Sequence, residues 1–268
     1  MKIPKIIYNV AAAILLFSLE ANAVDLSVAD SAYRKNNFKE AATLYSQAIQ
    51  QDGISAGLLY NLGNTYYKLG KDGEAMLCYE RARKLDPGNK EINENLNFLR
   101  SKVQDANKGS LQGKAGNLNP DQETFIESIY RILTIETRSN SWAVFAVMAF
   151  ILFLGGMAMY MFTPNVLARK TGFFSGITFL GFTVIFLIIS YLGARQYNLR
   201  DEAILMNFTT ELLEEADVNS APSTVPLHKG TKLKILETKS GGDGTEWLKV
   251  KLNSENVGWV KKEGIEII

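Results

Sequence analysis

Few side chains in this 268-residue chain could carry covalent chemistry. There is one cysteine, Cys78, and one histidine, His228. A zinc site usually needs several Cys or His ligands, and a Ser-His-Asp triad needs its histidine between a serine and a carboxylate. One cysteine and one histidine make either site hard to build. The glycine-rich stretch Gly241–Gly244 lacks the Lys-Ser/Thr that follows the glycines of a phosphate-binding loop. The sequence therefore predicts a protein that is not an enzyme and holds no metal or cofactor. Cys78 is either a buried, inert thiol or a redox sensor.

Binding chemistry has more support, because residues 24–105 contain a repeat. Ala41, Tyr45 and Ala48 recur 34 residues later as Ala75, Tyr79 and Ala82. The second unit shows the fuller pattern of small and aromatic residues: Leu59, Leu62, Gly63, Tyr66, Ala75, Tyr79, Ala82 and Pro87. This pattern resembles the tetratricopeptide repeat, a stack of helix pairs. We expect two repeats, closed by a capping helix over Lys90–Gln104.

The resemblance implies a concave face lined by the first helix of each repeat. In the family's register that face carries a mixture of tyrosines, cations and amides: Asp30, Tyr33, Arg34, Tyr60, Asn64, Tyr67 and Lys68. Tyrosines give large contact area, and Asn and Lys side chains can hold a peptide backbone or carboxylate. We therefore predict that these residues bind a protein partner. The alternative is that two repeats form a shallow surface of ordinary solvated side chains.

Two apolar runs, Ser141–Thr163 and Phe173–Ala194, contain no Asp, Glu, Lys, Arg or His. A membrane-spanning helix needs roughly 20 predominantly apolar residues. The sequence predicts a transmembrane hairpin with helices over residues 141–163 and 173–194 and a short cytoplasmic loop over 164–172. Because intramembrane charges mark ion and proton paths, a transporter or channel is not expected.

The N-terminus predicts the side on which the rest of the chain lies. Lys2 and Lys5, an apolar core and the site Ala21-Asn22-Ala23 have the layout of a secretory signal peptide over residues 1–23. The alternative is an uncleaved anchor. Both alternatives export the chain, and a hairpin returns it to the same side. The soluble parts are then both periplasmic.

Residues 106–140 are predicted to be a linker and a juxtamembrane helix. Gly109, Gly113 and Gly116 indicate a flexible linker over 106–120. Apolar residues at helical spacing, beginning with Phe125 and Ile126, predict a helix over 121–136. This helix either lies along the membrane surface or extends the first spanning helix.

Residues 201–268 alternate short apolar strands with Gly-rich turns. The predicted strands are 203–206, 211–216, 231–236, 247–252, 257–260 and 265–268, a pattern typical of a small barrel. The order of Pro222, Trp247-x-Lys-Val and Gly258-Trp259-Val260 resembles the bacterial SH3 domain. The resemblance implies an SH3-like β-barrel whose binding surface includes Pro222, Trp247 and Trp259. The alternative is that both tryptophans are structural.

The order of these parts resembles the aerotolerance-operon E (BatE-like) family of Bacteroidetes. The predicted fold class is therefore α plus small β with membrane helices: an α-solenoid, a two-helix hairpin and an SH3-like barrel. The resemblance implies a bacterial inner-membrane protein that works with von Willebrand A-domain membrane proteins. A net charge of +1 gives no electrostatic case for nucleic acid. We expect a non-enzymatic, membrane-anchored scaffold that binds protein partners in the periplasm, and the resemblance implies that it does so in an aerotolerance and envelope-assembly complex. The alternative is an envelope sensor that binds peptidoglycan through its SH3 domain.

Overall fold

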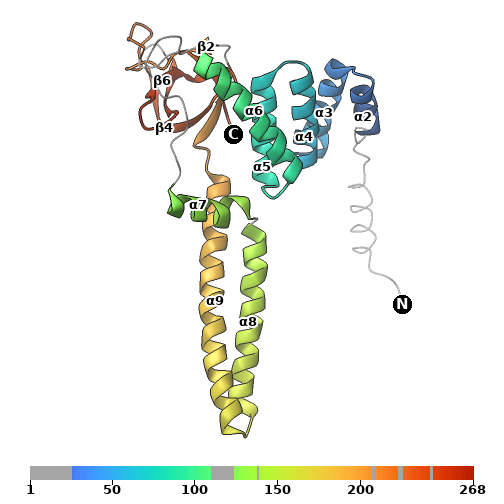
Figure 1. The fold of residues 1–268 in the computed structure, drawn as a ribbon, viewed down its shortest axis with the longest axis vertical. Coiled ribbons are helices and arrows are strands. Elements are labelled where there is room, and N and C mark those ends of the chain that lie inside the picture. Colours follow the sequence, from blue (N-terminus) through green and yellow to red (C-terminus); the bar gives the residue numbers. More distant parts are fainter. Residues whose placement is uncertain (1–25, 110–123, 138, 207–208, 223–225, 242–243) are drawn as a thin grey trace, which may run out of the picture.

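The computed structural model describes residues 26–109, 124–137, 139–206, 209–222, 226–241 and 244–268. The predicted signal peptide, residues 1–23, lies outside the described residues, as does most of the predicted linker. Figure 1 shows a head made of the helical repeats and a small sheet, with a long pair of helices projecting from it.

The repeats form a stack of five helices. They are α2 (Leu26–Arg34), α3 (Phe38–Asp52), α4 (Ala56–Lys68), α5 (Asp72–Leu85) and α6 (Lys90–Gly109). Gly63 is required where α4 crosses α5, because a Cβ there would lie 2.7 Å from the Tyr79 ring. Gly70 follows α4 with φ of +71°, a left-handed conformation that glycine adopts without strain. The predicted helix stack is confirmed.

Helix α6 is longer than the predicted capping helix, since it continues past Gln104 to Gly109. The first residues of the predicted linker, 106–109, are therefore helical. Asn107 explains the extension: its side chain is buried and bonds to the β module, donating to Thr231 Oγ1 at 2.9 Å. A tertiary contact thus overrides the local composition that indicated a linker.

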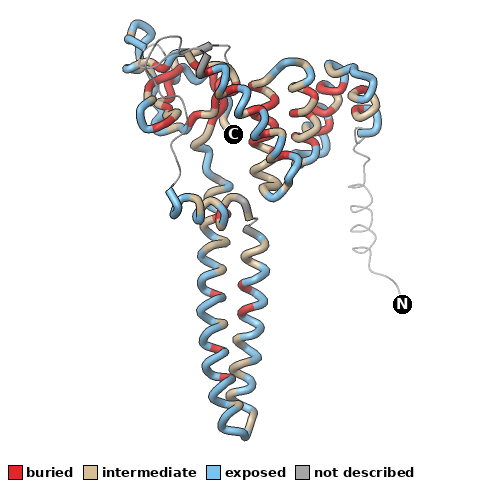
Figure 2. Tube along the Cα trace, in the orientation of Figure 1, coloured by how far each residue is buried: buried red, intermediate tan, exposed pale blue. Residues whose placement is uncertain are grey.

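The apolar runs form α8 (Ser139–Phe162) and α9 (Val166–Asn198), which pack side by side (Figure 1). Few of their residues are buried inside the protein, whereas the core helix of a soluble protein is mostly buried (Figure 2). Both are long and apolar enough to cross a membrane. Gly156 packs on Gly172 and Gly176, where a Cβ would meet backbone atoms at 2.8–3.0 Å.

The loop between the two helices is shorter than the predicted 164–172. Helix α9 already begins at Val166, and the Asn165 side chain accepts a hydrogen bond from Leu167 N as its N-cap. The cations predicted to lie in the loop, Arg169 and Lys170, are thus in the first turns of α9. The Arg169 guanidinium lies over the Tyr160 ring at 5.4 Å.

A short helix precedes the hairpin and is separate from it. Helix α7 (Phe125–Arg131) continues as a π-helix, η1 (Ile132–Glu136), and runs across the top of the hairpin in Figure 1. Thr124 and Glu127 form a capping box that fixes its start. The Trp142 indole donates to Leu133 O at 2.8 Å and ties the segment to α8. Of the two predicted alternatives, a straight extension of the spanning helix does not match this arrangement.

The C-terminal module is a five-stranded antiparallel sheet in the order β6-β5-β4-β1-β7, with a separate pair β2-β3. The strands are β1 (Glu202–Leu205), β2 (Thr209–Thr210), β3 (Leu227–His228), β4 (Lys232–Ser240), β5 (Glu246–Lys251), β6 (Val257–Lys261) and β7 (Ile265–Ile267). A 3-10 turn, η2 (Lys262–Gly264), connects the last two strands. The core is aliphatic and includes Leu205, Leu233 and Val250.

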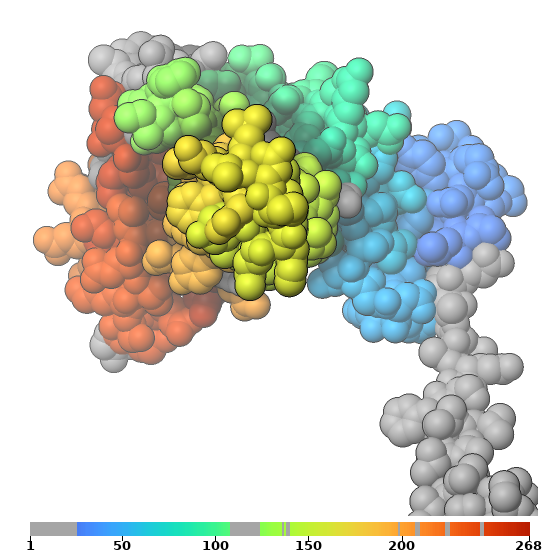
Figure 3. All heavy atoms as spheres, turned by 90° about the horizontal axis from the view of Figure 1, so that it is seen from below, coloured from blue at the N-terminus to red at the C-terminus, as the bar shows by residue number. Residues whose placement is uncertain are grey.

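The sheet corrects two predictions. It is not a closed barrel, because β6 and β7 are its two edges and are not paired with each other. The predicted strand over 211–216 is also wrong. Only Leu213 pairs there, in isolated bridges with Pro222 and Trp259. Leu212 beside it is fully buried, so its side chain packs in the core although its backbone belongs to no strand. Figure 3, a view along the hairpin from below, shows the repeats and the β module on opposite sides of it.

Candidate functional site

The concave face of the repeats contains two adjoining hollows of about 130 and 280 Å³. Tyr33 and Asn64 line both. Six of the seven sequence-predicted residues line these hollows: Asp30, Tyr33, Arg34, Asn64, Tyr67 and Lys68. They come from α2 and α4, the first helices of the two repeats. We call this surface the concave pocket; its binding role stays a prediction.

The floor of the concave pocket is a hydrogen-bonded network. The Tyr79 hydroxyl donates to Asn64 Oδ1 at 2.7 Å, and Asn95 Nδ2 donates to the same oxygen at 2.9 Å. Because its oxygen is occupied, Asn64 is oriented so that Nδ2 remains as a donor. Burial raises the pKa of Tyr79, so its hydroxyl stays protonated and keeps this donor role. The amide is thereby fixed before any ligand arrives.

One wall of the pocket is aromatic and cationic. The Tyr67 and Phe98 rings meet edge to face at 5.9 Å, and the Phe98 side chain is 59% exposed. Lys102 Nζ lies 5.3 Å from the Tyr67 ring centroid and pairs with Asp72. A partly buried tyrosine and an exposed phenylalanine beside an oriented amide are suited to holding an apolar side chain of a peptide while the amide bonds its backbone.

Sequence reasoning missed Asn61, Asn95 and Phe98, which also line the pocket. Asn95 and Phe98 are in α6, to which only a capping role was given. An exposed phenylalanine on that helix was the available signal. Tyr60 was predicted at the site but lines neither hollow; its hydroxyl accepts from Asn95 at 3.2 Å, and its ring lies 6.1 Å from Tyr79. Tyr60 supports the floor from behind.

The repeats and the β module are joined through a buried carboxylate. Glu80 on α5 is fully buried and pairs with Arg83 on α5, Arg100 on α6 and Lys232 on β4. Burial alone would raise the pKa of Glu80, but Lys232, Arg100 and Arg83 outweigh that effect and lower it. Glu80 therefore stays ionised and links both modules. We call this group the Glu80 junction.

Further contacts surround the Glu80 junction. Ile204 and Ile268 of the β module pack into the same core as Met76 and Leu99 of the repeats. Asn107 Oδ1 accepts from His228 N at 2.7 Å, and Lys229 pairs with Glu74 at 2.7 Å. Apolar and polar contacts together hold the two modules in one orientation, which fixes where the concave pocket faces.

The three residues predicted for the SH3 surface do not form one exposed patch. Trp247 and Trp259 are only 2% and 9% exposed. Lysines cover their rings: Lys261 lies over Trp247 at 5.8 Å, and Lys249 lies over Trp259 at 5.8 Å. Pro222 is exposed and bridges Leu213. This placement matches the alternative that both tryptophans are structural.

The single cysteine is placed where it is unreactive. Cys78 is buried in the repeat core, and burial raises its pKa to about 12. At neutral pH the thiolate, which is the reactive form, is scarce. Of the two predicted roles, this environment favours the inert thiol.

The helix stack, the concave pocket and the docked sheet on an apolar hairpin define a helical-repeat protein with an SH3-like module. Residues 29–70 and 56–89 match the tetratricopeptide repeat, and residues 212–266 match the GW (Gly-Tryp) dipeptide domain. The matched dipeptide type is present here as Gly258-Trp259. The chain thus contains TPR repeats, which suggest protein–protein interaction, and a C-terminal GW domain, a bacterial SH3-like domain that suggests cell-wall binding. A comparison with curated proteins finds no match.

Proposed function

We propose that this protein is a non-enzymatic, membrane-anchored scaffold that binds a segment of a partner protein in the concave pocket. The observation that carries the proposal is the oriented Asn64 amide beside the Tyr67–Phe98 wall. The repeat matches support it, because such repeats suggest protein–protein interaction. No step of this function needs a nucleophile or a bound metal.

The chemistry of the pocket describes the segment it takes. An apolar or aromatic side chain packs on Tyr67 and Phe98. Asn64 Nδ2 donates to a backbone carbonyl beside it. Arg34 and Lys68 at the rim supply positive charge, and Asp30 supplies an acceptor. Burying one apolar side chain on the wall contributes about 1.5–3 kcal/mol, which suits a reversible contact.

We infer that the hairpin crosses a membrane and holds the head at its surface, because both helices are long and apolar enough to span one. We infer that the membrane is the bacterial inner membrane and that both soluble modules are periplasmic. The GW match supports this side, because such domains suggest cell-wall association. From the family resemblance we further propose that the scaffold works in an aerotolerance and envelope-assembly complex, with von Willebrand A-domain membrane proteins as partners.

Photocrosslinking in intact cells tests the scaffold. A photoreactive residue in place of Lys68, at the pocket rim, is expected to capture a discrete set of membrane or periplasmic proteins. Asn64→Ala and Tyr67→Ala together remove the oriented donor and half of the wall. We expect this pair to reduce capture by about 10-fold or more, since each anchor contributes about 1–2 kcal/mol. Lys39→Ala on α3, outside the pocket, is the matched control. Equal capture by all three proteins contradicts the proposal.

A second candidate function is peptidoglycan binding by the GW domain, favoured by the match over residues 212–266. Purified cell-wall sacculi are incubated with the full chain in detergent and sedimented. Co-sedimentation that is lost in Lys239→Gln/Lys249→Gln, which uncovers Trp259, supports a wall-binding surface on β4–β6. If the protein does not co-sediment while the concave pocket still captures proteins, peptidoglycan binding is contradicted and the scaffold function is retained.

A further inference from the structure

The two edges of the five-stranded sheet are treated differently. The β6 edge is covered, because Leu213 N donates to Trp259 O at 2.8 Å and Trp259 N donates to Leu213 O at 2.7 Å. No described residue forms such a pair with the outer side of β7, the other edge. Natural proteins usually cover or blunt an edge strand, because its unpaired groups are a template for another strand. An open edge inside a domain junction therefore needs an explanation.

The register of β1 and β7 shows which groups of β7 face outward. Ile268 N donates to Glu202 O, and Met206 N donates to Gly264 O. In this register every second residue of β7 is hydrogen-bonded to β1. Ile265 and Ile267 fall between these pairs, and their backbone groups face away from β1. Ile265 N donates to Lys262 O, and Ile267 O accepts from Arg81 Nη2 at 2.7 Å.

Two outward groups remain, Ile265 O and Ile267 N, and no hydrogen bond to either is found among the described residues. An acceptor and a donor two residues apart on one edge are the pair that a single residue of an added parallel strand satisfies. The added residue donates its N–H to Ile265 O and accepts from Ile267 N at its own C=O. The outer edge of β7 can therefore form one parallel β-bridge with an added strand.

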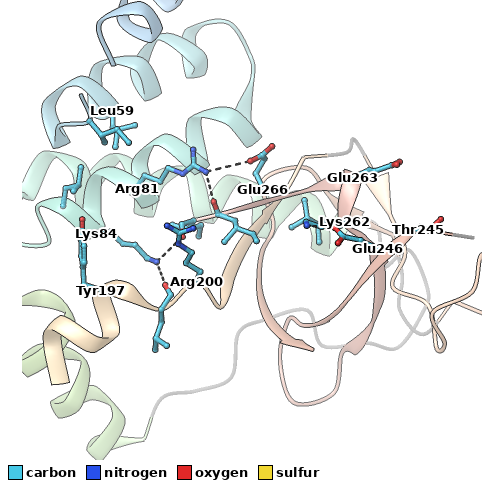
Figure 4. A pocket seen from close by; sticks show the side chains of 17 residues that line it. Leu59, Arg81, Lys84, Tyr197, Arg200, Thr245, Glu246, Lys262, Glu263 and Glu266 are labelled. Carbon is cyan, nitrogen blue, oxygen red and sulfur yellow. Dashed lines mark hydrogen bonds and ion pairs between the residues drawn. The ribbon is translucent and has the colours of Figure 1, made fainter. Parts of the chain in front are cut away.

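These groups lie in a cleft of about 1250 Å³. Figure 4 shows its three walls: the repeats with Arg81 and Lys84, the end of α9 with Tyr197 and Arg200, and the β module with Glu266. Lys84 Nζ donates to Leu199 O and Ile268 O, which fixes the α9 end against β7. The cleft is large enough for several residues of an extended chain, and it borders the point where α9 leaves the membrane-spanning part.

The side chains that line the cleft indicate which residues a bound segment would carry. Ile54 is 65% exposed and Leu199 is 36% exposed, so apolar surface faces the cleft. Arg81 and Lys262 are paired with Glu266 and Glu246, whereas Arg200 has no partner among the described residues. An occupant with apolar residues and one acidic residue complements these walls.

We propose that the β7 edge is a second binding site, which takes an extended polypeptide segment of a partner protein by parallel strand addition at Ile265 and Ile267. The segment carries apolar residues and an acidic residue that pairs with Arg200. Main-chain bonds supply the affinity and the cleft walls supply the specificity, as in other strand additions. This site is separate from the concave pocket and does not depend on the function proposed for that pocket.

The test uses the full chain in nanodiscs and a phage-displayed library of random dodecapeptides as the probe. Selected peptides are then synthesised, and their Kd is measured by fluorescence anisotropy. Ile267→Pro removes the outward N–H without breaking a hydrogen bond to β1, although it also fixes φ and changes the side chain, and we expect it to weaken binding at least 10-fold. Ile267→Val keeps the N–H and should bind as the parent does. Arg200→Gln should weaken binding several-fold, whereas Asn64→Ala/Tyr67→Ala should leave it unchanged.

Two measurements keep the proposal testable if Ile267→Pro unfolds. N-methylation of successive peptide residues should abolish binding at one position only, the residue that donates to Ile265 O. Amide hydrogen exchange of the free chain should be fast at Ile267 and slow at Glu266, and bound peptide should slow Ile267. The proposal is overturned if no selected peptide shows the single sensitive position, or if Ile267 is already protected in the free chain.

Discussion

Replacing Glu80 with glutamine should loosen the head more than any other single polar change, because three cations converge on this one carboxylate. Glu80 is fully buried, and Arg83, Arg100 and Lys232 keep 17%, 38% and 24% of their side chains exposed. Breaking a fully buried ion pair costs about 3–5 kcal/mol. Because the cations are partly hydrated, we reduce this to about 2–4 kcal/mol for Glu80→Gln.

Hydrogen exchange measures this loss where it occurs. A loss of 2–4 kcal/mol corresponds to roughly 30- to 700-fold faster exchange wherever opening passes through the junction, at 1.4 kcal/mol per factor of ten. We expect that acceleration in α5, α6 and β4, with α8 and α9 unchanged. Lys232→Met is the matched control. It keeps the alkyl chain and leaves Glu80 with two cations, but it also removes the ion pair with Glu202, so it should cost about 1–2 kcal/mol, less than Glu80→Gln.

The pH dependence gives an independent check. The folded-state pKa of Glu80 is lowered below its ordinary value of 4.5, so its contribution is fully present above that pH. The contribution is lost as the pH falls below 4.5 towards the lowered pKa. The parent protein should therefore lose head stability in that window, and Glu80→Gln should show a smaller loss. Equal exchange rates and equal acid sensitivity in the two proteins would refute the electrostatic account of the junction.

Three further predictions follow from packing. Gly156→Ile should separate α8 from α9 and lower the midpoint temperature of thermal unfolding in detergent, because a Cβ at Gly156 would meet a backbone atom at 2.8 Å. Gly155→Ile is the control, because a Cβ at Gly155 would have open space around it. Cys78 should resist maleimide at pH 7 in the folded protein and react within minutes after denaturation, and fast labelling of native protein would contradict its burial. Ile126→Glu should reduce quenching of a nearby fluorophore by brominated lipids if α7 lies on the membrane surface, since Ile126 is 78% exposed; unchanged quenching argues against that contact.

Sequence periodicity was sufficient where one local rule dominates. The 34-residue recurrence predicts the helix stack, because Gly63 and Tyr79 are constrained by the same close crossing. The charge-free runs predict the two apolar helices. The open sheet was not predictable from alternation, because strand patterns do not say whether two edges meet. The end of α6 was missed because Asn107 is held by Thr231, more than a hundred residues away.

The lining of the concave pocket was largely predictable, because the register of the tetratricopeptide repeat assigns residues to one face of a helix without knowledge of how the modules pack. The Glu80 junction and the β7 edge were not, because each depends on how two modules meet. Glu80 looks like an ordinary helix residue until Lys232 approaches it, and Ile267 looks like an ordinary strand residue until β1 is paired on one side only. Local pattern therefore predicted the residues that line the concave pocket within one module and missed both features between modules.

The Glu80 junction also decides how the two proposed sites can act together. Arg81 and Lys84 on α5 line the cleft, whereas Asn64 on α4 lines the concave pocket, so the two sites lie on different helices of one repeat. Because Glu80 locks α5 to β4, a segment bound at β7 and a segment bound in the concave pocket are held at a fixed separation. A scaffold that binds two segments on one rigid head raises their effective concentration towards each other without any conformational change. Loosening the junction with Glu80→Gln should therefore weaken simultaneous binding more than binding at either site alone.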